Sequence, residues 1–201
     1  MTVFRSLDPA TGTPVWEGVA ATPQDCAAAV ARARAALPAW RTAPLADRIA
    51  VARRFAELLE DQREDFATLI SRETGKLLWE TRAEVGSMAG KVAVSIAAQA
   101  ERAGERSSDT AFGRAVLRHR GHGVMAVLGP YNFPGHLPNG HIVPALLGGN
   151  TVVFKPSEIT PAVGAHMVAL WEQAGLPAGV LNLVQGGRET GEALVACDID
   201  G

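Results

Sequence analysis

Three short polar segments that follow apolar runs contain the residue types best suited to chemistry. Residues 129–135 read GPYNFPG, residues 155–158 read KPSE and residues 185–191 read QGGRETG. Together they offer an amide, an ammonium group, a carboxylate and two adjacent glycines: Asn132, Lys155, Glu158, Gly186 and Gly187. A nucleotide needs such groups, because its hydroxyls and phosphates require donors, acceptors and close approach of the backbone. The segments therefore indicate a nucleotide site if the fold brings them together.

Each of these residues also has a purely structural interpretation. Asn132 lies between two prolines and could only shape a turn. Lys155 and Glu158 could form a solvated pair before a helix, where a carboxylate is favourable. The glycines at 186 and 187 could only turn the chain, because the spacing is not that of a GxGxxG phosphate loop. Considered singly, these residues do not separate the two interpretations.

The elements that would position these segments can be read from periodicity and capping residues. Apolar residues recur at the helical period, and hydroxyls, carboxylates or glycines mark the ends. At Thr22, for example, a hydroxyl cap is followed by Pro23 at the first helical position and by Asp25 in the first turn. The pattern predicts four helices before residue 104, at about 22–36, 45–59, 61–75 and 79–102.

The pattern changes after Gly104 to short apolar runs that alternate with amphipathic stretches. Residues 105–110 are expected to form a loop, and Thr160 is expected to cap a helix. Strands are predicted at about 114–119, 123–128, 151–154 and 180–184, and helices at about 137–147, 160–174 and from 189. This alternation predicts an α/β fold, a Rossmann-like parallel sheet with flanking helices that follows an N-terminal helical arm. Ligands of such sheets bind beyond the carboxyl ends of the strands, where the three polar segments would meet.

Composition excludes several other classes of function. Of 201 residues, 19 are basic and 21 acidic, and the formal charge of -2 argues against nucleic-acid binding. The longest apolar runs, such as 124–128 and 142–147, are far shorter than the ~20 residues that span a bilayer. The N-terminal residues also lack the apolar core of a signal peptide. We therefore expect a cytoplasmic protein without membrane or nucleic-acid partners.

Cysteine and histidine give no convincing nucleophile or metal ligand. Cys26 and Cys197 cannot form a disulfide framework, and neither has a His or Lys beside it in the sequence to lower the pKa of its thiol. A structural role is expected for both. The five histidines lack a metal-binding spacing, so that no metal site is expected.

Two long segments together resemble the cofactor-binding core of the aldehyde dehydrogenase superfamily. They are GVMAVLGPYNFP at 123–134 and PALLGGNTVVFKPSE at 144–158. Residues 8–12, DPATG, and residues 73–76, ETGK, are further landmarks, so that the resemblance covers essentially the whole chain. It implies an enzyme that uses NAD to oxidise an aldehyde to a carboxylic acid. In that chemistry a cysteine thiolate adds to the aldehyde, hydride passes to the nicotinamide, and water releases the acid from a thioester.

The resemblance also implies roles for the polar residues. Asn132 would donate its amide to the aldehyde oxygen, on which negative charge develops in the first step. Lys155 and Glu158 would hold the hydroxyls of the adenosine ribose. The other residues expected at the cofactor are Pro130 and Tyr131, on the nicotinamide side, and Gly186 and Gly187.

The same resemblance implies that the cofactor-binding domain is incomplete. Residues 198–201 resemble the approach to a further strand, and the superfamily's nucleophilic Cys, general-base Glu and Gly-Ser phosphate motif would lie beyond Gly201. The expected organisation is a helical arm over 1–112, a projecting oligomerisation strand over 113–122 and the first βαβαβ part of the NAD-binding domain over 123–201. A homo-oligomer is expected for the complete protein. We expect the 201 residues alone to be inactive.

One segment is similar to a particular subgroup of the superfamily. Residues 133–144, FPGHLPNGHIVP, and Tyr131, where most members have Trp, resemble the N-succinylglutamate 5-semialdehyde dehydrogenases of arginine breakdown. His136 and His141 follow Asn132 and could donate to the carboxylates of such a substrate, or could cap a helix. Two other interpretations remain open, a dehydrogenase for another small aldehyde and a non-catalytic nucleotide-binding fragment.

Overall fold

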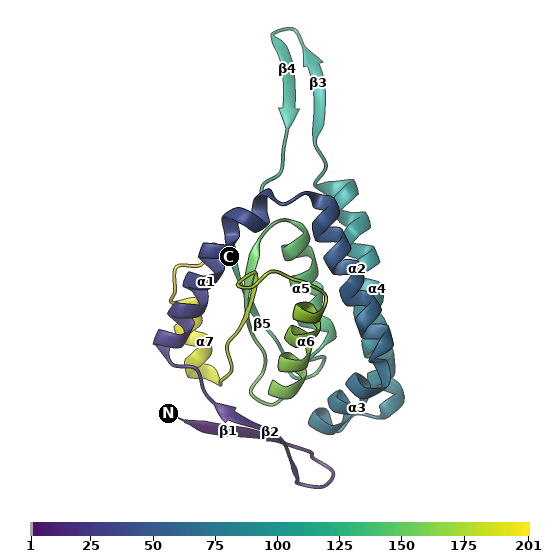
Figure 1. Ribbon diagram of the computed structural model, residues 1–201, viewed down its shortest axis with the longest axis vertical. Helices are drawn as coiled ribbons and strands as arrows, with labels where there is room; N and C mark the ends of the chain where they lie inside the picture. Colours follow the sequence, from purple (N-terminus) through teal and green to yellow (C-terminus); the bar gives the residue numbers. More distant parts are fainter. Residues whose placement is uncertain (1) are drawn as a thin grey trace.

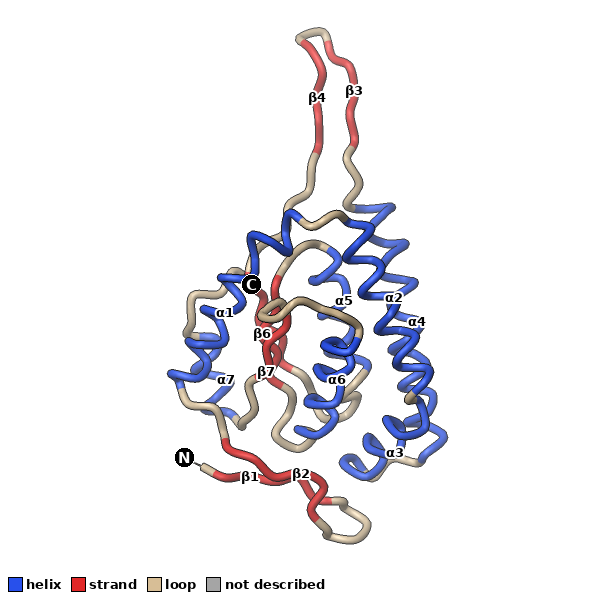
Figure 2. The backbone as a smooth tube through the Cα atoms, in the orientation of Figure 1, coloured by secondary structure: helices blue, strands red, loops and turns tan. Residues whose placement is uncertain are grey.

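The computed structural model describes residues 2–201 and arranges them in layers around a parallel sheet (Figure 1). The helices are α1 (Pro23–Thr42), α2 (Leu45–Asp61), α3 (Arg63–Thr74), α4 (Leu78–Arg102), α5 (His136–Leu147), α6 (Pro161–Gln173) and α7 (Arg188–Val195). The strands are β1 (Val3–Leu7), β2 (Pro14–Val19), β3 (Arg106–Thr110), β4 (Gly113–Leu117), β5 (Val124–Leu128), β6 (Thr151–Lys155) and β7 (Leu181–Leu183). Helices α1 and α7 cover one face of the sheet, α5 and α6 cover the other, and α2 to α4 form an outer layer (Figure 2). Within residues 2–201, no helix is both long and apolar enough to cross a membrane.

The parallel sheet has the strand order β5–β6–β7, and every residue of the middle strand is buried. Val124 at the start of β5 lies opposite Thr151 of β6. On the other edge of β5, Asp200 N donates to Val124 O and Ala126 N donates to Gly201 O, both at 2.8 Å. The chain thus extends the sheet from β5 through β6 to β7 and then returns to the opposite side of β5. Such a reversal of strand order marks the place where open α/β sheets bind ligands.

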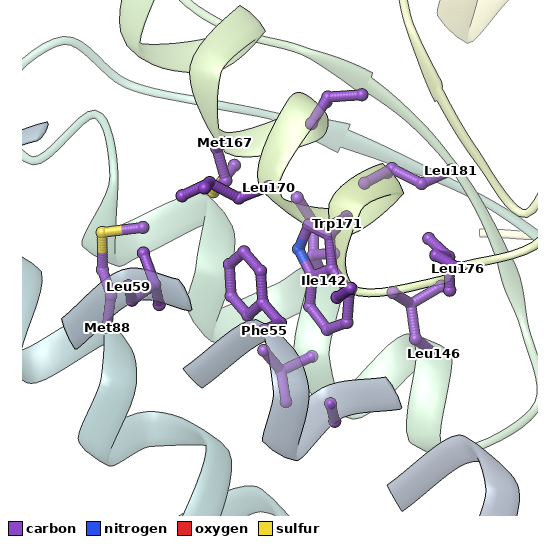
Figure 3. Close-up of a cluster of buried hydrophobic side chains, with 14 of the residues drawn as sticks. Phe55, Leu59, Met88, Ile142, Leu146, Met167, Leu170, Trp171, Leu176 and Leu181 are labelled. Carbon is purple, nitrogen blue, oxygen red and sulfur yellow. The ribbon is translucent and has the colours of Figure 1, made fainter. Parts of the chain in front are cut away.

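A large apolar core joins the sheet layer to the outer helices. Phe55 of α2 stacks on Trp171 of α6, with ring centroids 3.9 Å apart and ring planes 8° from parallel (Figure 3). Met88 of α4 and Ile142 of α5 are fully buried in the same cluster. Full burial of one such side chain contributes about 1.5–3 kcal/mol. Helices α2 to α4 and the sheet therefore pack as one unit, so that residues of the outer helices can position groups near the sheet.

Small side chains cover the other face of the sheet. Ala29 and Ala33 of α1 are fully buried and pack in one cluster with Val124 and Val153. The start of α1 has the predicted cap, because the Thr22 hydroxyl accepts from Asp25 N and the Asp25 carboxylate accepts from Thr22 N. Small residues and a fixed start let α1 approach the sheet closely.

The predicted helices and the strands of the parallel sheet are confirmed to within a few residues, but the N-terminal half contains strands that the pattern does not predict. The hairpin β1–β2 precedes α1, and residues 106–110, expected in a loop, form β3. All residues of β3 are exposed, so it lacks the alternation of apolar and polar residues that reveals a strand. The strand predicted at about 114–119 is present as β4, which ends at Leu117. Helix α1 also continues past residue 36, because Leu37 and Trp40 extend its buried face.

Candidate active site

The three polar segments meet at the carboxyl ends of the parallel strands, as the sequence predicts. Gly129 N, after β5, donates to Lys155 O at the end of β6 at 2.8 Å. A Cβ at Gly129 would lie 2.9 Å from the Phe154 ring, so only glycine permits this approach. Lys155 in turn donates from Nζ to Gly186 O, after β7, at 2.7 Å. Backbone and side-chain contacts thus bring all three segments to one edge.

Lys155 and Glu158 form a partly buried ion pair at this edge. The Lys155 side chain is 9% exposed, and its Nζ donates to Pro156 O at 2.9 Å and to Gly186 O. Burial lowers the pKa of Lys155, and the Glu158 carboxylate 3.8 Å from Nζ partly opposes that effect. An ammonium group has three donors, so one remains available for a ligand or for Glu158. The Glu158 side chain is 51% exposed and can accept from the hydroxyls of a ligand.

A groove of about 630 Å³ lies beside this ion pair, between the strand ends and α7. Leu128, Val195 and Ala196 give it apolar walls, and Lys155 and Glu158 give it polar groups. A Cβ at Gly191 would lie 3.5 Å from Lys155 Cε, so the absence of a side chain there keeps this part of the groove open. An apolar slot beside a carboxylate and an ammonium group fits a flat base joined to a sugar with hydroxyls. The residues present therefore fit the nucleoside part of a dinucleotide.

The glycine pair after β7 acts through its backbone. Gly186 has a φ of 149°, and a Cβ there would overlap the Thr190 side chain. Its carbonyl holds Lys155, as described above. Gly187 precedes α7, and a Cβ on it would lie 4.0 Å from the Glu158 carboxyl carbon. Gly186 is thus required by conformation, while Gly187 leaves room beside Glu158.

Asn132 lies in the exposed loop between β5 and α5. Its Oδ1 accepts a hydrogen bond from Phe133 N at 3.1 Å, which leaves the amide hydrogens free to donate to another group. In the same loop Pro130 is half-buried, and Tyr131 exposes 57% of its surface. The amide oxygen of Asn132 is thus occupied by a backbone N–H, while its NH₂ group is free to donate. An oxyanion would need such a donor.

Two buried carboxylates of the outer helices bind the starts of α5 and α6. Glu73 of α3 accepts from Ala162 N and Val163 N, each at 2.9 Å, and from the Ser6 hydroxyl. Burial raises the pKa of Glu73, and these hydrogen bonds oppose that effect. Thr160 is the N-cap residue of α6, as predicted, but its hydroxyl makes no capping hydrogen bond. Glu73 of the distant helix α3 accepts from two of the free N–H groups instead.

Glu84 of α4 plays the corresponding part at α5, which follows the Asn132 loop. Its Oε1 accepts from Gly135 N at 3.0 Å and from His136 N at 3.1 Å. Its Oε2 lies 2.9 Å from Lys76 Nζ, and the Glu84 side chain is fully buried. Sequence reasoning does not single out Glu84, Glu73 or Lys76 as functional, although Glu73 and Lys76 belong to the ETGK landmark.

The remaining sequence candidates lie in different surroundings. His136 Nδ1 is buried and has no hydrogen-bond partner among residues 2–201. His141 is exposed and lines a separate hollow with His122 beside the edge of β5. Cys26 is fully buried, and that burial raises the pKa of its thiol, which disfavours the reactive thiolate. The two histidines thus face different environments, and Cys26 is a poor nucleophile.

Comparison with known proteins agrees with this fold. The model of the aldehyde dehydrogenase family matches residues 1–199, and the chain belongs to that family. The chain is similar to N-succinylglutamate 5-semialdehyde dehydrogenase 2 of Caulobacter vibrioides, with 65% identity over 198 residues. That match covers 98% of this chain and 41% of the relative, so the chain spans about two fifths of the relative's length.

Solved structures of the family have the same arrangement. An NAD-dependent benzaldehyde dehydrogenase from Corynebacterium glutamicum is 31% identical, with a TM-score of 0.88, over 96% of this chain and 43% of that one. An NADP-dependent glyceraldehyde-3-phosphate dehydrogenase from Bacillus halodurans, solved with NADP, is 28% identical, with a TM-score of 0.89, over 96% of this chain and 42% of that one. Neighbours of this fold therefore include both NAD- and NADP-dependent enzymes.

Proposed function

We propose that this chain forms the cofactor-binding part of an aldehyde dehydrogenase that oxidises an aldehyde to a carboxylic acid with NAD. The observation that carries the proposal is that the loop of Asn132, the Lys155–Glu158 pair and the loop of Gly186 meet at one sheet edge, through the contacts of Gly129 and Gly186 with Lys155. The strand order reverses at this edge. Membership of the aldehyde dehydrogenase family supports it. The portion of the relatives outside the matched region would supply the nucleophile and the general base.

The cofactor would lie in the groove beside Lys155 and Glu158. NAD, when bound, accepts hydride from the aldehyde carbon. Glu158 would accept from both ribose hydroxyls, while the free donor of Lys155 would bind one of their oxygens. A carboxylate at this point disfavours a 2′-phosphate, so we propose NAD rather than NADP. Pro130, Tyr131, Gly186 and Gly187 would border the cofactor, the first two on its nicotinamide side.

Asn132 would act on the substrate rather than on the cofactor. Its free amide hydrogens would donate to the aldehyde oxygen as negative charge develops there. The amide oxygen of Asn132 already accepts from Phe133 N, and this contact orients the side chain so that its NH₂ group can donate to the substrate. Fixed neutral donors of this kind stabilise an oxyanion without having to reorganise during the reaction.

The proposed substrate is N-succinylglutamate 5-semialdehyde, as an intermediate of arginine breakdown. The similarity of the chain to the N-succinylglutamate 5-semialdehyde dehydrogenase 2 of Caulobacter vibrioides and the segment 133–144 support this choice. The substrate carries carboxylates, and His136, at the start of α5, is the nearest candidate donor in the sequence after Asn132.

The test uses an enzyme of full length, made by joining residues 1–201 to the remainder of the Caulobacter vibrioides relative. We call it the joined enzyme. Its kcat/KM with NAD is measured for N-succinylglutamate 5-semialdehyde and for propanal. We expect the semialdehyde to be preferred by at least about a hundredfold, because its carboxylates supply binding energy that propanal lacks. Equal values for the two aldehydes would overturn the proposed substrate, and no oxidation of either, by an enzyme that folds and binds NAD, would overturn the proposed activity.

A further inference from the structure

The start of α5 is held by a buried carboxylate that belongs to another part of the chain. Glu84 Oε1 accepts from two successive backbone N–H groups, those of Gly135 and His136, at 3.0 and 3.1 Å. These are among the N–H groups that a helix leaves without an internal partner. A carboxylate there also interacts favourably with the positive end of the helix dipole. Glu84 therefore fixes the position of the residues that directly follow the Asn132 loop.

Lys76 links the same carboxylate to the loop itself. Its Nζ lies 2.9 Å from Glu84 Oε2 and 3.7 Å from the centroid of the Phe133 ring. A cation over an aromatic face is attracted by the negative face of the ring. Phe133 N then donates to Asn132 Oδ1 at 3.1 Å. A continuous series of contacts thus runs from Glu84 through Lys76 and Phe133 to the amide of Asn132.

The backbone behind this series has little room to move. A Cβ at Gly135 would lie 2.5 Å from Met88 Sδ and 3.5 Å from Glu84 Oε1. One turn along α5, Asn139 Nδ2 donates to Met88 O at 3.0 Å, and both groups are buried. Helix α4 therefore supports α5 by close packing, and Glu84 supplies the charged contact at its start.

We propose that Glu84 is a positioning residue for Asn132, with Lys76 as its partner, and that the pair holds the amide donor in place for the aldehyde oxygen. This inference rests on the proposed function of Asn132. Glu84 does not need to touch the substrate or the cofactor, because it acts through α5 and Phe133. Loss of the pair would displace the donor, and displacement by about 1 Å can reduce a rate a hundredfold.

The decisive variant is Glu84→Gln in the joined enzyme. The amide keeps the size of the side chain but removes its charge and places a donor opposite either Lys76 or the backbone N–H groups. We expect kcat to fall at least about tenfold, the NAD dissociation constant to stay within about twofold, and hydrogen exchange over residues 129–137 to become faster. Unchanged kcat or unchanged exchange would overturn the inference.

The matched control is Glu73→Gln, which removes the other buried carboxylate of the outer helices. Glu73 binds the start of α6, so its loss should lower the melting temperature while kcat and exchange over residues 129–137 stay within about twofold of the parent enzyme. If this variant slows kcat as much as Glu84→Gln does, the effect is general destabilisation and the inference fails. Lys76→Gln is a milder second variant, for which we expect a smaller change of the same sign.

A double variant separates this inference from the proposed function. If Glu84 acts through Asn132, the kcat of the double variant Glu84→Gln/Asn132→Ala should be no lower than the kcat of Asn132→Ala alone. If instead the two substitutions lower kcat by factors that multiply, the positioning role of Glu84 is overturned and the role of Asn132 is left intact. A near-normal kcat for Asn132→Ala alone would remove the proposed function of Asn132 and the inference with it.

Discussion

The two sides of the candidate site are held in place by different parts of the chain. On the proposed cofactor side, Lys155 is fixed by carbonyls of Pro156 and Gly186, all within the sheet layer. On the proposed aldehyde side, Asn132 lies in an exposed loop whose following residues are bound by Glu84 of the outer layer. The cofactor side therefore depends on contacts around the sheet, while the aldehyde side also depends on the outer helices.

This difference predicts that the two sides can be disturbed independently. A change in the ion pair beside the groove should alter cofactor binding and leave the donor in place. A change in the Asn132 loop or its support should alter the chemical step and leave the groove intact. The core around Phe55 and Trp171 is the physical link between the two layers (Figure 3).

The largest expected effect is that of Asn132→Ala in the joined enzyme. We expect kcat to fall by ~10²-fold or more, about 3 kcal/mol, because loss of one oxyanion donor typically costs that much. The NAD dissociation constant should barely change, since the groove is formed by other residues. Kinetics, NAD titration and the melting temperature are measured on one preparation. A near-normal kcat would remove Asn132 from the mechanism, and a parallel loss of stability, NAD binding and rate would make it only a turn former.

The next effect concerns the cofactor side. We expect the joined enzyme to prefer NAD to NADP, and Glu158→Gln to reduce the ratio of the two kcat/KM values about tenfold, because the neutral amide no longer repels a 2′-phosphate. The comparison is made with Glu57→Gln, an exposed carboxylate of α2, which should leave the ratio unchanged. Comparable values for NAD and NADP in the parent joined enzyme would contradict the assigned role of Glu158.

The meeting of the polar loops at Lys155 could be predicted from the sequence because its determinants are local. Apolar strands followed at once by polar loops show where the strand ends lie, and parallel strands bring those ends to one edge. The glycine at 186 and the lysine at 155 belong to such loops. Nothing beyond strand order is needed to place them together.

The support of the aldehyde side could not be predicted, because it depends on partners far apart in the sequence. Glu84 lies 51 residues before Gly135, and Glu73 lies 89 residues before Ala162. A carboxylate inside a helix is typically solvated, and only the packing of α3 and α4 against α5 and α6 buries these two. Strand β3 could not be predicted for a related reason, since pairing with β4 rather than an apolar face defines it, whereas the apolar residues of β4 mark it as a strand.

The hairpin β3–β4 is a third region, and it projects from the body of the molecule (Figure 1). All residues of both strands are exposed, and Phe112 at its tip is fully exposed. Two-stranded hairpins are marginally stable alone, and an open strand edge favours pairing with another chain. We expect the joined enzyme to be an oligomer at micromolar concentration, and replacement of residues 106–117 by a short Gly-Ser linker to lower its mass in light scattering. A monomeric parent enzyme would contradict this prediction.

The smallest expected effect is on the pH dependence of stability, and it concerns the contact between the outer layer and α6. His166 of α6 packs on Phe66 of α3, with ring centroids 4.5 Å apart, and burial lowers the pKa of this histidine while Asp65 opposes the shift only partly. Because the folded-state pKa lies below that of the unfolded chain, the contribution of His166 to stability is present above about pH 6.5 and is lost as the pH falls through the folded-state pKa. His166→Leu should therefore reduce the loss of stability between pH 7 and pH 5, measured by denaturant unfolding of the joined enzyme. The exposed His119 provides the control, since His119→Leu should leave that loss unchanged. An equal acid-induced loss in the parent and in His166→Leu would show that protonation of His166 does not weaken this contact.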